Sequence, residues 1–99
     1  MKTGFDTNVL IAACIEDHEH HDRAFELLER VLVGTDHGVI SAHTLAEAYA
    51  VMTRLPKPLR VAPRVAASLL EENYMKTFEV ITLTRVEYQE LIIRLGQAT

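Results

Sequence analysis

The chain of 99 residues lacks the features that define several large classes of protein. It has one cysteine and only four glycines, so neither an internal disulfide nor a glycine-rich phosphate loop is expected. Its longest uninterrupted apolar run is the seven residues from Val9 to Ile15, whereas a membrane-spanning helix needs roughly 20. Asp6 and Asn8 interrupt the segment in which a secretory signal would be apolar. We therefore expect no membrane association and a cytoplasmic location.

The composition is typical of one globular domain. Hydrophobic residues make up 48% of the chain and charged residues 24%, and the net charge is −4. An acidic protein disfavours non-specific nucleic-acid binding, but the charge here is uneven. Seven acids lie within residues 16–36, whereas residues 48–70 contain no acid and four bases, which are Arg54, Lys57, Arg60 and Arg64. This basic segment is either a solvated surface or a set of contacts to a phosphate backbone.

Short β-like runs alternate with helical patterns along the chain. Strands are expected near residues 2–6, 38–41 and 79–83, and helices near 7–15, 22–33, 44–55, 63–75 and 85–95. Asp22 is a plausible N-cap, and Thr44 with Glu47 and Thr84 with Glu87 have the spacing of capping boxes. The helix at 22–33 is expected to bury an apolar stripe of Phe25, Leu28, Val31 and Leu32. The order of elements predicts an α/β fold with a short parallel sheet and crossover helices.

Asp6 is the first candidate for chemistry, because it follows the first expected strand and precedes a helix. Ligands in open α/β sheets bind at the carboxyl ends of the strands, and hard divalent cations prefer oxygen ligands. Asp6 is therefore a candidate metal ligand, with Thr7 and Asn8 as neighbours that orient it or contact a phosphate. The alternative is that Asp6 only caps the helix that follows.

Glu47 is the second candidate. A helix turns about 100° per residue, so Glu47 lies roughly opposite the apolar stripe of its helix and shares the outward side with His43. It is either a capping-box glutamate on a solvated face or a second metal carboxylate that faces the cleft of Asp6.

Three histidines, His18, His20 and His21, cluster in one polar stretch. They lack both a helical i, i+4 pair and a neighbouring cysteine, so we interpret them as part of an exposed loop rather than as a zinc site.

Taken in order, these landmarks resemble the PIN-domain nucleases, and in particular the VapC-type toxins of bacterial toxin–antitoxin pairs. In that family a strand-end aspartate followed by Thr-Asn opens the domain, as in Asp6-Thr7-Asn8. A glutamate lies inside the pattern SxxxLxEAYxVxTRLP, which residues 41–56 reproduce with Glu47 as the acid. Residues 78–84 are similar to the third strand of the family and the start of the next helix. The resemblance covers essentially the whole chain.

The resemblance implies a three-layer α/β/α PIN-like fold and a metal-dependent endoribonuclease of the toxin–antitoxin type. Asp6 and Glu47 would be catalytic residues that bind Mg²⁺ or Mn²⁺, and the metal would lower the pKa of a bound water. Thr7 and Asn8 would support the metal ligands or contact the substrate. The implied partners are an RNA substrate, a cognate antitoxin protein and a second copy of the chain in a homodimer. The basic segment would contact the RNA backbone.

The end of the chain departs from the family pattern. Family members continue past the helix that ends near Gly96 and carry further acids of the metal site in a G-x-x-x-x-D context. Here the last acid is Glu90, which we expect to face away from the strand ends. Residues 1–99 are therefore expected to form a single partial domain, C-terminally incomplete, with little cleavage by this chain alone. The alternative is a truncated or non-catalytic PIN-domain remnant that acts as a protein-interaction module.

Overall fold

The computed structural model describes residues 1–97, apart from the side chains of Leu91 and Leu95. Within them, strands β1 (Lys2–Gly4), β2 (His37–Ser41) and β3 (Glu79–Ile81) form a parallel sheet in the order β1-β2-β3. β2 pairs with both neighbours, and the outer strands are shorter than predicted. The predicted α/β fold with a short parallel sheet is confirmed.

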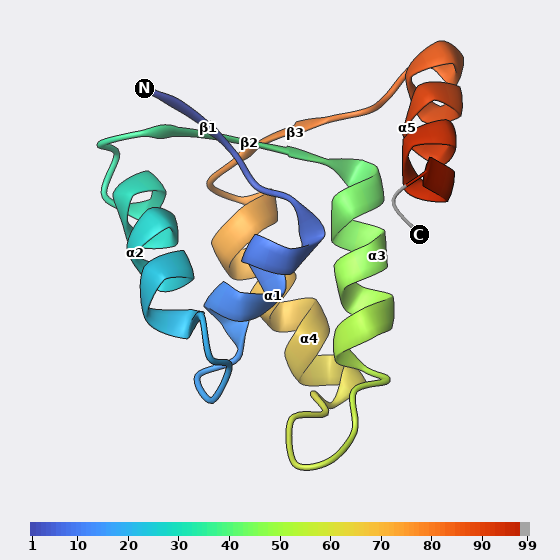
Figure 1. Ribbon diagram of the computed structural model, residues 1–99. Helices are drawn as coiled ribbons and strands as arrows, with labels where there is room; N and C mark the ends of the chain where they lie inside the picture. The colour runs from blue at the N-terminus through green and yellow to red at the C-terminus, as the bar shows by residue number, and fades with distance from the viewer. Residues whose placement is uncertain (98–99) are drawn as a thin grey trace.

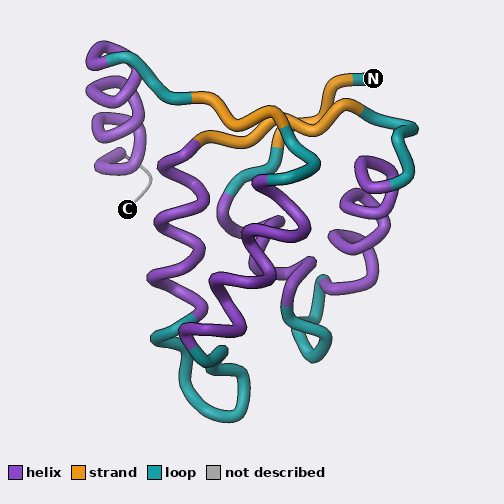
Figure 2. The backbone as a smooth tube through the Cα atoms, turned by 180° about the vertical axis from the view of Figure 1, so that it is seen from behind, coloured by secondary structure: helices purple, strands orange, loops and turns teal. Residues whose placement is uncertain are grey.

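The helices connect the strands and form a layer against the sheet. The described residues contain α1 (Thr7–Cys14), α2 (His21–Leu32), α3 (Ala42–Met52), α4 (Pro63–Leu70), the π-helical turn η1 (Glu71–Met75) and α5 (Arg85–Gln97). Helices α1 to α4 lie on one face of the sheet (Figure 1), because two right-handed crossovers that step in the same direction place their helices on the same side. Helix α5 stands apart from this layer, beyond the end of β3 (Figure 2). No helix within residues 1–97 has the length and apolar character needed to cross a membrane.

The core lies between the sheet and this helical layer. An aromatic cluster fills it, with the ring centroids of Phe5 and Phe78 5.1 Å apart and those of Tyr74 and Phe78 4.9 Å apart. A Cβ atom at Gly38 would lie 2.6 Å from the Phe78 ring and 2.8 Å from Val31 Cγ1. Only glycine therefore allows β2 to pass this close to the cluster, and this packing fixes the position of the strand that leads into the cleft described below.

Helix α2 differs from the sequence prediction in its N-terminal residue and in the side chains that it buries. It begins at His21, so the predicted Asp22 cap is wrong, and Asp22 lies in the first turn instead. Phe25 is 40% exposed although the pattern predicts it to be buried, and Ala24 is buried in its place. Leu32 is likewise exposed, whereas the other two members of the stripe are buried. The small Ala24 side chain allows α2 to pack closely on α1, and Phe25 stacks on the His21 ring outside the core at 5.3 Å.

Helix α3 begins one turn earlier than the capping-box pattern predicts. Ser41, the last residue of β2, is the N-cap, and its Oγ accepts a hydrogen bond of 3.0 Å from the Thr44 N–H. The predicted capping box of Thr44 and Glu47 is therefore wrong, which leaves the Glu47 side chain free of a capping role. The box at the start of α5 is confirmed, because the Thr84 N–H donates to Glu87 Oε1 at 2.8 Å and the Glu87 N–H donates to Thr84 Oγ1 at 3.2 Å.

Asp36 is a buried acid just before β2. Arg30 Nε donates to Asp36 Oδ2 at 2.9 Å, and Thr3 Oγ1 donates to the same oxygen at 3.4 Å. The hydrogen bond from Arg30 holds the pKa of the Asp36 carboxyl below its ordinary value. A carboxyl whose pKa is lowered by folding stabilises the fold above its unfolded pKa, and this contribution is lost as the pH falls through the folded pKa.

We expect Asp36→Asn to unfold at a lower urea concentration than the unchanged chain at pH 7, and the difference to shrink below about pH 4. Urea titrations followed by circular dichroism at several pH values measure this effect. Asp17→Asn, a change at an exposed loop position, is the matched control. A difference between Asp36→Asn and the unchanged chain that stays constant down to the lowest pH would contradict the assigned role of the Asp36 charge.

Candidate active site

A cleft of about 510 Å³ opens at the carboxyl ends of β1 and β2. Three parts of the chain line it: the β1–α1 junction, the start of α3 with the residue before it, and the segment that runs from Leu83 into α5. This is the edge of a parallel sheet at which ligands bind in α/β proteins. The sequence-predicted residues Asp6, Thr7, Asn8 and Glu47 all line this one cleft.

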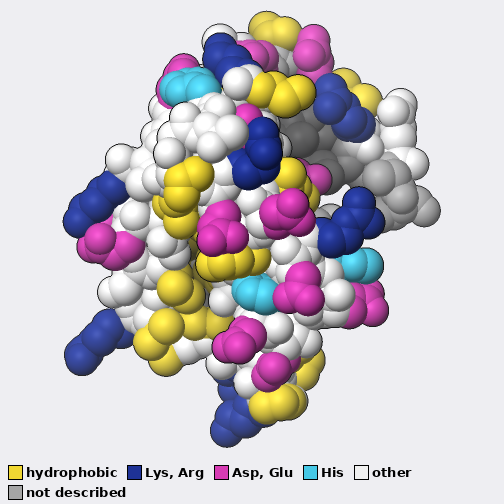
Figure 3. Space-filling model, turned by 90° about the vertical axis from the view of Figure 1, so that its left-hand side faces the viewer, with side chains coloured by type: hydrophobic (Ala, Val, Ile, Leu, Met, Phe, Trp, Pro, Cys, Tyr) yellow, Lys and Arg dark blue, Asp and Glu magenta, His cyan; other side chains and the backbone are white. Residues whose placement is uncertain are grey.

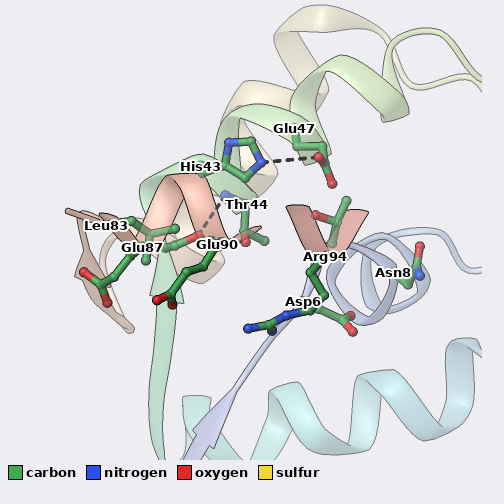
Figure 4. Close-up of a pocket in the computed structure, with 11 residues that line it drawn as sticks. Asp6, Asn8, His43, Thr44, Glu47, Leu83, Glu87, Glu90 and Arg94 are labelled. Carbon is green, nitrogen blue, oxygen red and sulfur yellow. Dashed lines mark hydrogen bonds and ion pairs between the residues drawn. The ribbon is translucent and has the colours of Figure 1, made fainter. Parts of the chain in front are cut away.

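Asp6 holds a fixed position at the edge of the cleft. Its Oδ1 accepts a hydrogen bond of 2.9 Å from the Val9 N–H, which makes Asp6 the N-cap of α1. The capping alternative considered from the sequence is therefore confirmed as a local role. A cap uses one carboxylate oxygen, so the same side chain can also present an oxygen to the cleft that it lines. Asn8, in contrast, points toward the far side of α1 (Figure 4).

Glu47 enters the cleft from the second turn of α3. Its Oε2 lies 3.4 Å from Nε2 of His43, one turn earlier on the same helix, and both side chains are about 40% exposed. The His43 ring also meets the Tyr88 ring of α5 edge-on, with centroids 5.9 Å apart. The Glu47 carboxylate points from α3 toward the part of the cleft where Asp6 lies (Figure 4). Two acids 41 residues apart in sequence thus reach one cavity from different elements.

Helix α5 adds three charged side chains that the sequence analysis did not assign to a site. Glu87, Glu90 and Arg94 all line the cleft, so the expectation that Glu90 faces away from the strand ends is wrong. The reason is that α5 starts close after β3 and stands beyond the strand ends, beside α3 (Figure 1). The spacing 87, 90 and 94 places the three residues on one helix face, which is the sequence signal that identifies them.

The cleft is strongly acidic. Asp6, Glu47, Glu87 and Glu90 contribute carboxylates to its lining, and Arg94 contributes a guanidinium. Hydrogen bonds to Thr84, the one from the backbone first, hold the pKa of the Glu87 carboxyl below its ordinary value, so Glu87 stays ionised at neutral pH. A concave surface lined with charge of one sign concentrates ions of the opposite sign. The cleft is therefore suited to a cation.

The donor atoms in the cleft allow a test of which cation fits. Asp6 and Glu47 offer carboxylate oxygens, and Thr7 offers a hydroxyl. Within residues 1–97, no group of three or more histidine, cysteine or acidic side chains is close enough together to hold a metal ion. Mg²⁺ commonly uses one or two carboxylates and keeps several of its waters. The oxygen donors and the size of the cleft fit such a hydrated ion.

The basic segment lies at the opposite end of α3 from the cleft. Helix α3 ends earlier than predicted, so Arg54, Lys57 and Arg60 lie on the loop that follows it and Arg64 lies in α4 (Figure 1). None of the four lines the cleft. A contact between this segment and a ligand in the cleft therefore requires a ligand long enough to follow α3.

Comparison with known proteins places these residues in a family context. A family model described as PIN domain matches residues 5–99. Ribonuclease VapC40 of Mycobacterium tuberculosis is 39% identical over 75 residues, which cover 71% of this chain and 51% of that protein. Ribonuclease VapC27 of the same organism is 38% identical over 71 residues, which cover 70% of this chain and 47% of that protein. The chain thus spans about half the length of the curated relatives it matches.

Proposed function

Because the chain belongs to the PIN-domain family, we propose that it acts as a metal-dependent endoribonuclease of the VapC toxin type. The observation that carries this proposal is the convergence of Asp6 and Glu47 on one acidic cleft at the strand ends. The similarity to two proteins named as ribonucleases supports RNA as the substrate.

The residues of the cleft would have different roles in phosphodiester hydrolysis. Asp6 and Glu47 would hold the ion, Asp6 from a position fixed by its cap and Glu47 from α3. When bound, Mg²⁺ or Mn²⁺ supplies a water of lowered pKa and offsets the charge of the scissile phosphate. The Thr7 hydroxyl, which lines the cleft, would donate a hydrogen bond to a phosphate oxygen. The Asn8 amide points toward the far side of α1 (Figure 4) and would contact the substrate only outside the centre of the cleft. Arg94 provides a guanidinium for a further phosphate oxygen on the α5 side of the cleft.

The proposed partners extend beyond the cleft. The basic segment of Arg54, Lys57, Arg60 and Arg64 would contact the backbone of an RNA that runs along α3. Each such phosphate contact steepens the slope of the logarithm of the binding constant against the logarithm of the salt concentration by about one unit. An antitoxin protein and a second copy of the chain are the protein partners that toxin–antitoxin function implies. We place this activity in the cytoplasm.

A second candidate function is a non-catalytic interaction module. The observation that favours it is that, within residues 1–97, no group of three or more histidine, cysteine or acidic side chains is placed to hold a metal ion. Under this alternative the acidic cleft would bind a partner and cleave no RNA.

Metal removal separates the two functions. We expect any cleavage of a mixed pool of RNA, which should be weak for residues 1–99 alone, to require Mn²⁺ or Mg²⁺, to be lost in EDTA, and to return when Mn²⁺ is added in excess, because the metal supplies the activated water. Product ends mapped by sequencing measure cleavage. Cleavage that persists in EDTA would contradict metal dependence, and RNA that stays intact in Mn²⁺ would favour the interaction module.

A further inference from the structure

A second pocket lies next to the cleft, between α1 and α2. It has a volume of about 480 Å³ and is lined by both apolar and polar side chains. Val9, Ala12, Ala24 and Leu27 are its apolar members, and Asn8, His18, His20 and Arg23 are its polar members. Its exposed lining surface is mostly apolar, which suits the face of a planar ring.

Asn8 lines both cavities. The acidic cleft and this second pocket are therefore neighbours that share one side chain as a wall. A polymer whose backbone lies in the cleft can therefore reach the second pocket with a neighbouring substituent.

The histidines at the rim are held in place before any ligand binds. His18 Nδ1 accepts a hydrogen bond of 3.1 Å from the His20 N–H. In a neutral imidazole the other nitrogen then carries the proton, so His18 Nε2 is a donor. The two rings lie 5.7 Å apart. His21, which follows them, anchors the loop through a contact of 2.8 Å between its Nδ1 and the Ala12 carbonyl. The loop thus presents a half-buried aromatic ring and a donor at little ordering cost.

The side chains of the pocket lining suit a base and its attached phosphate. Acidic, basic and hydrophobic side chains mix over the face of the molecule that carries α2 (Figure 3), and among the described residues no acid lines the pocket itself. Arg23 is the charged residue of the pocket lining, and within the described part of the chain it forms no ion pair. Arginine and histidine planes are the surfaces on which unstacked RNA bases pack.

We propose that this second pocket binds the unstacked nucleobase of a nucleotide adjacent to the one held in the acidic cleft. The proposal rests on the proposed function and adds a base-binding subsite to it. The apolar floor of Val9 and Leu27 contacts the base, His18 contributes a ring and a donor, and Arg23 packs against the base or pairs with its phosphate.

The test compares RNA with bases against a backbone without them. Binding of short homopolymer RNA oligonucleotides and of an abasic oligonucleotide of equal length is measured by fluorescence anisotropy in EDTA, which prevents cleavage. A stacked base contributes about 1–3 kcal/mol, which corresponds to roughly 5–150-fold in affinity. We expect His18→Ala and Leu27→Gln each to weaken binding of at least one homopolymer within this range and to leave binding of the abasic oligonucleotide unchanged.

Two matched variants control for general damage. Leu32→Gln changes a leucine of the same helix as Leu27, and the two side chains are nearly equally exposed, Leu32 to 39% and Leu27 to 40%. His37→Ala removes an exposed histidine that pairs with Glu79 at 2.8 Å and lies outside both cavities. Neither is expected to change RNA affinity.

The outcomes separate this inference from the proposed function. Equal losses for abasic and base-containing oligonucleotides, or no loss in either pocket variant, would overturn the base-binding subsite; a pocket that receives a peptide gives the second result. Those results do not contradict the proposed nuclease function if the unchanged protein still cleaves RNA in Mn²⁺. A protein that neither binds nor cleaves any RNA removes the nuclease proposal, and the subsite with it.

Discussion

Asp6→Asn is expected to lower metal-dependent RNA cleavage by about 100-fold or more while the fold stays intact. Asparagine caps a helix as well as aspartate does, and its carbonyl oxygen can accept the same hydrogen bond from the Val9 N–H that Asp6 accepts at 2.9 Å. The substitution therefore removes the negative charge and keeps the shape. Cleavage rates at saturating Mn²⁺ and Mn²⁺ affinity by calorimetry measure the effect.

Asp6→Ala separates the two roles of Asp6. It removes both the charge and the cap, so we expect the same loss of cleavage together with a loss of about 1 kcal/mol in the free energy of unfolding. Thermal unfolding of both variants makes the comparison. If Asp6→Asn cleaves RNA as fast as the unchanged protein, the proposed role of Asp6 as a metal ligand is wrong and only its capping role remains.

Glu47→Gln is expected to reduce cleavage by a similar factor and to raise the Mn²⁺ concentration that gives half-maximal activity. The amide keeps the size of the side chain but loses the charge that would hold the ion. Its contact with His43, at 3.4 Å, involves partly exposed groups, so little stability should be lost. Initial rates across a Mn²⁺ series provide the measurement.

Two controls show whether Glu47 acts on the ion or only through its neighbour. Glu72→Gln breaks an ion pair of the same i, i+4 type, with Lys76 at 2.9 Å, outside the cleft lining, and should leave the rate unchanged. His43→Gln removes the partner of Glu47 and keeps the carboxylate. If His43→Gln shifts the Mn²⁺ dependence as much as Glu47→Gln does, the direct metal role of Glu47 is wrong.

The parallel sheet could be predicted because the order of elements leaves few topologies. Strands joined by helical segments return in the same direction, and right-handed crossovers fix the layer that the helices form. Individual caps were less predictable. Ser41 and Thr44 are both good capping residues three positions apart, and the Glu47 that completes a capping box after Thr44 favoured the wrong one. The extended backbone at Ser41, which comes from its place at the end of β2, decides between them.

The candidate cleft was predictable from its two junction acids but not from α5. Asp6 and Glu47 follow the first two strands closely, so sheet geometry alone brings them to one edge. Glu90 and Arg94 reach the same cavity only because of the direction in which α5 leaves β3, and the local pattern does not encode that direction. Phe25 shows the same limit, since helical periodicity allowed either Phe25 or Ala24 to face α1 and close packing of the two helices selected the smaller side chain.

The short junctions between strands and helices set which length changes the chain can tolerate in evolution or engineering. β2 ends at Ser41 and α3 begins at the next residue, so an insertion between Ser41 and Glu47 has no loop to absorb it. One added residue there would rotate Glu47 by about 100° around the helix axis and out of the cavity. The connection of residues 53–62 carries no such constraint, because neither its length nor its path sets the direction of a cleft side chain. Natural or designed insertions are therefore expected to accumulate at that end of α3, where the molecule can grow new binding surface without disturbing its acids.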